Sequence, residues 1–376
     1  MEQLKNVIYA PCLRSSQYDL LALKEIEAPR RKLITPIISA RGNNLGLIHD
    51  FARNWEGECF WLDVSRFPQD SQTELSALLN EPADNFKSKL SAFREIQRVN
   101  PAMLPVVGFR SGDKQRHVVQ FALGLYDLFP AVAIRVEGAG AVLERNIATA
   151  RAVLNAVSDA DLRRTVLILD AWGISQMPSL QEGSSIQKML RLSGEYDVAK
   201  VFTLSTSWPD DRPDRGTSAT VPCIDPFWQA IARKQLLKEG TTHVYGDYAA
   251  TNPMRDLLDD FDPKKMAQPI PFAGYYGNCV WRQERHGAGG ENEKFRDIAR
   301  SFRALASYHD DGFCWGTRAI AAIASGKRET PGNMAFWNKI RINQHICAML
   351  QDISGGLLEE LGNPHEPEYQ ELDDLI

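Results

Sequence analysis

Short apolar segments recur along the first two thirds of the chain, and stretches with helical periodicity separate them. Eight such segments are rich in β-branched and aliphatic residues, and they span residues 7–10, 33–39, 59–63, 104–109, 131–136, 166–170, 200–205 and 243–248. Continuous apolar runs of this length are typical of strands that are buried on both faces, as in parallel sheets. Eight of them with helical crossovers predict an α/β fold of the TIM-like (β/α)₈ barrel type.

The intervening stretches predict the helices of this barrel at residues 17–26, 85–99, 115–123, 141–156, 184–192 and 226–238. Pro11 is expected to end the first strand, because proline cannot donate to a strand ladder. A long loop is expected from Ser207 to about Thr220. Loops of this length are typically lids, binding loops or disordered segments.

The alternation stops after residue 250. Residues 270–281 are rich in aromatic side chains and predict a strand or hairpin, and three helices are expected at 293–307, 318–325 and 333–353. An acidic tail follows from residue 357. We therefore divide the chain into a barrel over residues 1–265 and an α-rich C-terminal extension over 266–376, with the hairpin, the helices and the tail.

Composition narrows the class of protein. Of the 376 residues 44% are hydrophobic and 24% are charged, with a formal net charge of −5, which argues against broad nucleic-acid binding. The six cysteines form no C-x-x-C pair, which favours free thiols in a reducing cytoplasm over a disulfide framework. No signal peptide and no membrane-spanning run of roughly 20 apolar residues is evident, so we expect a cytoplasmic protein.

Polar residues end or directly follow the predicted strands, at the end where (β/α)₈ barrels carry their active sites. Three arginines among them suit an anionic ligand, since guanidinium binds phosphate or carboxylate bidentately. The aspartates could hold Mg²⁺, orient the arginines or transfer protons. Three interpretations stay open: a binding pocket, an enzyme active site, and a salt-bridge network that closes an inert barrel mouth. The predicted ligand-binding set is Arg41, Asp63, Arg110, Arg135, Asp170, Ser205, Ser207, Asp247 and Tyr248.

Other motifs add little specific chemistry. The hydroxyls of Ser205 and Ser207 could receive a phosphate, as loops after strands 7 and 8 do in many barrels, but could equally serve as ordinary caps. The glycines after Glu137 lack dinucleotide-binding spacing, and the seven histidines lack H-E-x-x-H spacing, so we predict no cofactor and no metal. His345 shares a helix face with Trp337 and Arg341, which favours packing.

Several short segments, taken in order, resemble the Beta protein family, which is named for a protein of a satellite bacteriophage. They are YAP at 9–11, ITPII at 34–38, FWLD at 60–63, ILD at 168–170, STSWP at 205–209, YGDY at 245–248, and GN…W…NQH between Gly332 and His345. The resemblance covers nearly the whole chain. It implies a TIM-like barrel encoded by prophages and other mobile elements.

The resemblance also implies a role in anti-phage defence or toxin control, because the phage gene lies beside a killer gene and counters its toxicity. The expected partner is then a toxin or a phage component. No catalytic residues transfer with the resemblance, so whether the protein is an enzyme stays open. The alternative is a barrel enzyme or sensor that acts on a phosphorylated small molecule or nucleotide at the strand mouth.

Overall fold

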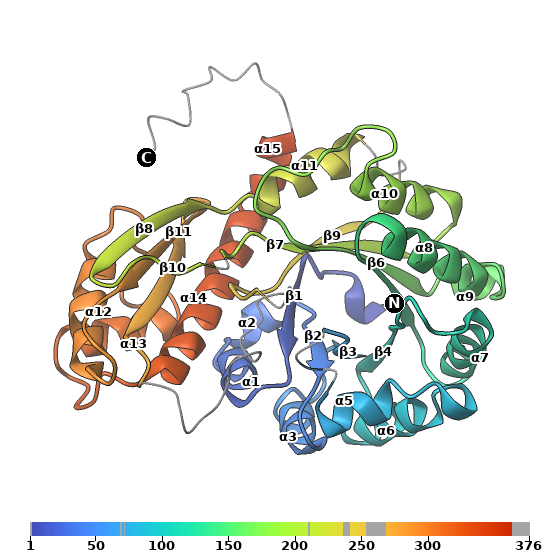
Figure 1. Cartoon of the computed structure of the whole chain (residues 1–376), viewed down its shortest axis with the longest axis horizontal. Coiled ribbons are helices and arrows are strands. Elements are labelled where there is room, and N and C mark those ends of the chain that lie inside the picture. The colour runs from blue at the N-terminus through green and yellow to red at the C-terminus, as the bar shows by residue number, and fades with distance from the viewer. Residues whose placement is uncertain are drawn as a thin grey trace.

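The computed structural model describes residues 2–67, 70, 72–209, 211–235, 241–252 and 268–362. Within these residues, eight parallel strands close into a barrel in the order β1-β2-β3-β4-β5-β6-β7-β9, which confirms the predicted TIM-like fold (Figure 1). The strands are β1 Tyr9–Arg14, β2 Ile37–Ala40, β3 Phe60–Val64, β4 Met103–Val107, β5 Val132–Glu137, β6 Thr165–Gly173, β7 Lys200–Thr206 and β9 His243–Asp247.

Helices surround this barrel and connect its strands. Ser16 begins the first of them, because its side chain accepts a hydrogen bond from the Asp19 N–H. The 3₁₀ turns in this part are η1 Glu2–Leu4 and η2 Ala83–Asn85. The α-helices are α1 Gln17–Lys24, α2 Ala28–Arg31, α3 Gly46–Asn54, α5 Glu74–Leu79, α6 Lys87–Val99, α7 Gln115–Tyr126, α8 Gly140–Leu154, α9 Asp159–Leu162, α10 Ser185–Glu195 and α11 Asp225–Gln235.

The barrel interior is a packed core. Trp61, Leu104, Ile168, Phe202 and Val244 fill it, each at most 2% exposed. A second apolar layer lies between the outer faces of the strands and the helices. Because the interior is filled, a ligand site can form only above this core, at the ends of the strands.

The prediction that Pro11 ends the first strand is wrong. β1 runs through Pro11 to Arg14, pairing with β9 over residues 9–11 and with β2 over residues 12–14. Proline lacks an N–H, so it forfeits one ladder bond, while the bonds of the neighbouring residues hold both sides of the strand.

A three-stranded antiparallel sheet, in the order β10-β11-β8, lies beside the barrel (Figure 1). Its strands are β8 Thr217–Pro222, β10 Phe272–Gly277 and β11 Val280–Arg285. The predicted hairpin is therefore confirmed, and its two turn residues, Asn278 and Cys279, have φ of 53° and 57°, as type I′ hairpin turns require. The loop expected up to Thr220 is wrong in part, because residues 217–222 form a strand against β11.

Helices pack against this sheet and join it to the barrel. α14 lies between β10 and α1, and most of its side chains from Trp337 to Leu350 are buried (Figure 1). The elements are η3 Asn292–Lys294, α12 Phe295–Arg303, α13 Trp315–Ala324, α14 Met334–Ser354 and α15 Leu357–Gly362. None of the helices in the described part is both long and apolar enough to cross a membrane.

The division at residue 265 falls between described ranges, and tail residues 363–376 also lie outside them. The domain boundary therefore stays a prediction. β8 belongs to the barrel half of the sequence but pairs with the extension, so the two halves share the appended sheet.

Candidate functional site

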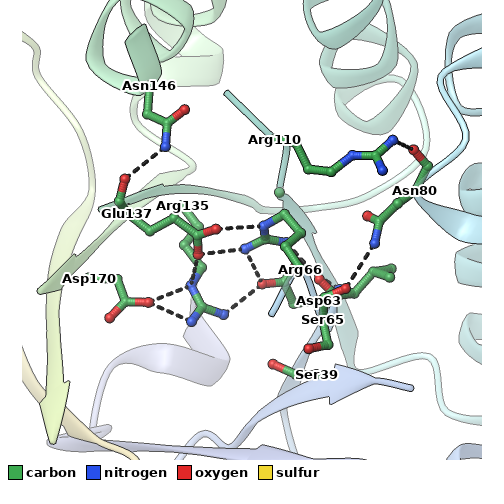
Figure 2. Close-up of polar contacts among 12 residues, drawn as sticks. Ser39, Asp63, Ser65, Arg66, Asn80, Arg110, Arg135, Glu137, Asn146 and Asp170 are labelled. Atoms are coloured by element: carbon green, nitrogen blue, oxygen red, sulfur yellow. Dashed lines mark hydrogen bonds and ion pairs between the residues drawn. The ribbon is translucent and has the colours of Figure 1, made fainter. Parts of the chain in front are cut away.

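Five charged side chains meet at the carboxyl ends of β3, β5 and β6 (Figure 2). Arg135 donates to Asp63 at 2.8 Å and to Asp170 at 2.6 Å, and it lies 3.3 Å from Glu137. Arg66, just beyond β3, donates to Asp63 at 2.8 Å and to Glu137 at 2.9 Å. We call Asp63, Arg66, Arg135, Glu137 and Asp170 the mouth cluster.

The mouth cluster is buried and holds two positive and three negative groups. Burial alone raises the pKa of a carboxyl, but Arg66 and Arg135 outweigh it and lower the pKa of Asp63 to about 2. At Asp170 burial dominates and raises the pKa, with the charge of Glu137 adding to it. The Tyr248 hydroxyl accepts from Arg135 at 2.7 Å and donates to Asp170 at 2.6 Å. The pKa is therefore lowered at Asp63 and raised at Asp170, although both carboxylates contact Arg135.

A cavity of about 210 Å³ opens beside the mouth cluster. Arg66, Arg135 and Glu137 line it with Ser39, Val64, Ser65, Phe67 and Trp172. Trp172, at the end of β6, has φ of 60°, a strained value for a bulky residue that is typical of functional positions. The backbone N–H of Trp172 donates to Asp170 Oδ1 at 2.9 Å, so a hydrogen bond joins the strained turn to the cluster.

Arg41 and Arg110 lie at the same end of the barrel but do not contact the mouth cluster directly. Arg41 donates to Asp70 at 2.8 Å, and Asp70 accepts from Ser65 at 2.7 Å. Arg110 donates to the Asn80 carbonyl at 2.6 Å, and the Asn80 amide donates to the Ser65 carbonyl at 2.8 Å (Figure 2). Neither arginine lines the cavity. Each is connected by hydrogen bonds to Ser65, which does line it.

Ser205, near the end of β7, and Ser207, just after it, belong to a separate buried network. Ser205 and Ser207 both donate their hydroxyls to Asp225, the first residue of α11. The Ser207 N–H donates to the same carboxylate at 2.8 Å. An internal carboxylate thus occupies the donors that the sequence offered to a phosphate, and phosphate binding here stays a prediction.

Asp247 lies at the centre of a third network, which joins the barrel to α14. It accepts from the hydroxyls of Tyr9 at 2.6 Å and Tyr245 at 3.1 Å, and from the Ala249 N–H at 2.8 Å. His345 Nε2 completes the set at 2.7 Å. Burial raises the pKa of Asp247, but His345, the Tyr9 hydroxyl and the Ala249 N–H outweigh it and hold that pKa below its usual range. His345 is packed in the core, as expected, and is also a hydrogen-bond partner of Asp247.

Sequence reasoning brought Asp63, Arg135, Asp170 and Tyr248 together correctly and missed several of their neighbours. Arg66 was not selected because it lies three residues past Asp63, beyond the end of the predicted strand at 59–63. The signal that could have found it is an arginine three residues after a strand-end aspartate, a spacing that lets the two side chains pair. Trp172 gave no chemical signal, because its importance lies in its backbone conformation.

The cluster can bind polar groups and move protons. Of the three carboxylates in the cluster, that of Glu137 is the most exposed. Its side chain is 11% exposed and lines the cavity. Asp170, with its raised pKa, could hold a proton next to Tyr248. Among the described residues, no group of three or more histidine, cysteine or acidic side chains is arranged to hold a metal ion.

These features define a TIM-like barrel protein with a buried ionic cluster and a small cavity at the strand ends. The sequence model of the Beta protein family matches residues 9–351, and the chain belongs to that family. The match confirms the resemblance stated above. No curated protein matches the chain.

Proposed function

We propose that this Beta-family protein acts in anti-phage defence or toxin control by binding a toxin or a phage-derived protein. The observation that carries the proposal is the open edge of the appended sheet. β8 pairs with β11 on one side, and no other described strand pairs with it on the other. Its residues alternate between exposed and half-buried from Ser218 to Pro222. Such edges accept an extended segment of another chain as an added strand.

The register identifies the groups that face the open side of β8. The Cys223 N–H donates to the Cys279 carbonyl, so these two residues form a hydrogen-bonded antiparallel pair. Pairs alternate along the ladder, and Thr220, opposite Arg282, belongs to the other kind. Its N–H and carbonyl therefore point away from β11, toward an incoming strand.

The opposite edge of the sheet is covered. The Gln344 side-chain amide accepts from the Tyr276 N–H at 3.0 Å and donates to the Tyr276 carbonyl at 2.7 Å. Beside the open edge, the Arg282 guanidinium donates to the Ser218 hydroxyl at 2.6 Å. Hydroxyls and a guanidinium suit a polar or acidic segment, so we take such a segment of the toxin or phage protein as the occupant.

Replacing Thr220 with proline tests this surface. The variant loses an outward N–H but keeps the pairing with β11, so the melting temperature should change little. The affinity for a purified toxin from the same mobile element should fall at least about tenfold. A tenfold loss corresponds to about 1.4 kcal/mol of binding free energy, roughly the net contribution of one hydrogen bond. Isothermal titration calorimetry measures the affinity, and co-expression measures growth rescue.

Thr220→Ser is the matched control, because serine keeps both the N–H and the hydroxyl, which accepts from Arg282 at 3.3 Å. It should bind the toxin as the wild type does. Wild-type affinity in Thr220→Pro would show that the toxin does not bind by strand addition at β8, and absence of any binding or rescue by the wild type would remove the toxin-control proposal itself.

The cavity at the barrel mouth favours a second candidate, an enzyme or sensor for a phosphorylated small molecule or nucleotide. An anion at Arg66 would have to displace Glu137, which holds two of its nitrogens at 2.9 and 3.0 Å. Glu137→Gln removes that competing charge. A phosphate ligand should therefore raise the melting temperature more in this variant than in the wild type.

Thermal-shift measurements with nucleotides and sugar phosphates decide the matter. A larger shift in Glu137→Gln supports an anion site at Arg66. A smaller shift indicates a ligand that binds the Glu137 carboxylate through its own donors. No shift with any member of the panel in either protein removes this second candidate.

A further inference from the structure

The hydrogen bonds of Arg66 leave no donor for an incoming anion. A guanidinium has five N–H donors. Arg66 Nε and Nη2 donate to Glu137 at 2.9 and 3.0 Å. Its Nη1 and Nη2 donate to Asp63 at 2.8 and 3.1 Å, and Nη1 also donates to the Val64 carbonyl at 2.7 Å. These bonds use all five donors, and Figure 2 shows the guanidinium held between Glu137 and Asp63.

The nitrogens of Arg135 also donate to partners inside the protein. Nε and Nη2 donate to Asp170 at 3.1 and 2.6 Å, and Nη1 donates to Asp63 at 2.8 Å. Nη2 donates to the Tyr248 hydroxyl as well, at 2.7 Å. With Arg66 included, the ionised mouth cluster has two guanidinium groups and three carboxylates, and therefore a net charge of −1.

The cavity beside the cluster offers oxygen acceptors. A carboxylate has about four lone-pair sites, and the arginines take one on Glu137 Oε1 and the others on Oε2, so Oε1 keeps an acceptor site. The Ser65 hydroxyl gives its proton to Asp70 at 2.7 Å, which leaves its lone pairs to accept. The Ser39 hydroxyl, which lies 3.8 Å from the Cys12 sulfur, lines the cavity too.

The rest of the cavity lining is apolar or aromatic. Val64, Phe67 and Trp172 supply it. Ring faces attract organic cations, whereas a phosphate would lose its hydration here without gaining arginine donors. The Trp172 indole N–H has no hydrogen-bond partner and is an uncharged donor. The volume of about 210 Å³ is below the roughly 300–1,000 Å³ of sites for drug-sized ligands, so only a small molecule fits.

We propose that this cavity binds a small primary aliphatic amine as its ammonium ion. The Glu137 carboxylate and the lining hydroxyls accept its N–H groups, and its alkyl chain packs on the apolar wall. A metal ion fits less well, since it takes about six oxygen ligands and the described residues include no group of three acidic, histidine or cysteine side chains arranged to hold one. The amine is independent of toxin binding at β8, and its charge is opposite to that of the phosphorylated ligand considered for this cavity.

Three probes of equal chain length and different charge test the ligand class on the wild-type protein. They are n-butylamine, butanol and butyrate, in a buffer without phosphate or other amines. Butylammonium should raise the melting temperature as its concentration rises into the millimolar range, because a ligand of the folded state stabilises it. Butanol and butyrate should not. No shift with butylammonium, an equal shift with butanol or a larger one with butyrate would overturn the proposal, and this comparison needs no variant to fold.

Glu137→Gln locates the amine. Glutamine keeps the size of the side chain and removes its charge, so the affinity for butylammonium, measured by calorimetry, should fall at least about tenfold, as expected for a hydrogen bond to a charged group. Glu195→Gln is the matched control, because it removes an equal charge from the exposed pair with Arg151 and should bind butylammonium as the wild type does.

An unchanged affinity in Glu137→Gln would place the amine elsewhere and overturn the proposal. A phosphorylated ligand predicts the opposite response, a larger stabilisation of Glu137→Gln than of the wild type. Neither result bears on the affinity of the Thr220 variants for the toxin, so failure of the amine site and failure of toxin binding at β8 are distinguishable.

Discussion

Replacing Arg135 with methionine is expected to cost about 3–5 kcal/mol of the free energy of unfolding at neutral pH, as when one partner of a buried ion pair is removed. Methionine keeps part of the side-chain volume but leaves Asp170 without its arginine, and the 2% exposed site admits little water. Asp63 still has Arg66 at 2.8 Å. The largest penalty should therefore fall on Asp170. Urea denaturation measures the loss.

The pH dependence of this loss has a definite sign. Burial already raises the pKa of Asp170, and losing Arg135 raises it further. A group whose pKa is higher in the folded state than in the unfolded state favours folding at low pH, and this contribution disappears as pH rises through the folded pKa. The deficit of Arg135→Met should thus be smallest in acid and largest at neutral pH.

Two comparisons make the result specific. Asp170→Asn in the Arg135→Met background should recover part of the loss, because it removes the unpaired charge. Arg151→Met breaks the exposed pair with Glu195 and should cost less than about 1 kcal/mol. If Arg135→Met also costs less than that, the mouth cluster does not stabilise the fold.

The barrel could be predicted because its strands are buried on both faces. Residues 166–169, for example, are all apolar and lie in the first half of β6, which extends from Thr165 to Gly173. A strand buried on both faces has a continuous apolar run in its own sequence, so it can be recognised without knowing which strands lie beside it. The strand ends then follow from topology, since parallel strands bring their carboxyl ends to one face.

β8 could not be predicted, because the residues that make it a strand, those of β11, lie elsewhere in the chain. Its six residues, TSATVP, are half-buried at most and have no apolar run. They form a strand because β11 pairs with them from Thr217 opposite Arg285 to Pro222 opposite Val280. A pairing partner some sixty residues away leaves no periodic signal in the segment itself.

The candidate site was predictable by position and not by partner. The strand-end rule selected Asp63, Arg135 and Asp170, which contact one another. It also selected Arg41 and Arg110, whose side chains turn to loop acceptors. Side-chain direction in a loop depends on the acceptors that tertiary structure supplies, and single-sequence patterns do not contain that information.

Replacing Asp247 with alanine should destabilise the protein by about 3–5 kcal/mol, because four donors lose their acceptor in a buried site. The donors are the hydroxyls of Tyr9 and Tyr245, the Ala249 N–H and His345 Nε2. His345 lies on α14, so the loss should also loosen the C-terminal helices from the barrel. Urea denaturation and limited proteolysis between β9 and α14 measure the two effects.

The pH dependence separates the lost charge from lost packing. The pKa of Asp247 lies below its usual range in the folded protein, so its contribution to stability is present above the unfolded value of about 4 and disappears as pH falls through the folded pKa. The stability deficit of Asp247→Ala should therefore be greatest near neutral pH and shrink in acid.

Asp225→Ala is the matched control. It leaves the hydroxyls of Ser205 and Ser207 without their acceptor, but it does not remove the hydrogen bond to His345 on α14. It should lower stability without faster cleavage at the α14 junction. Equal cleavage in both variants, or a deficit of Asp247→Ala that does not change with pH, would mean that the Asp247–His345 pair does not hold α14 to the barrel.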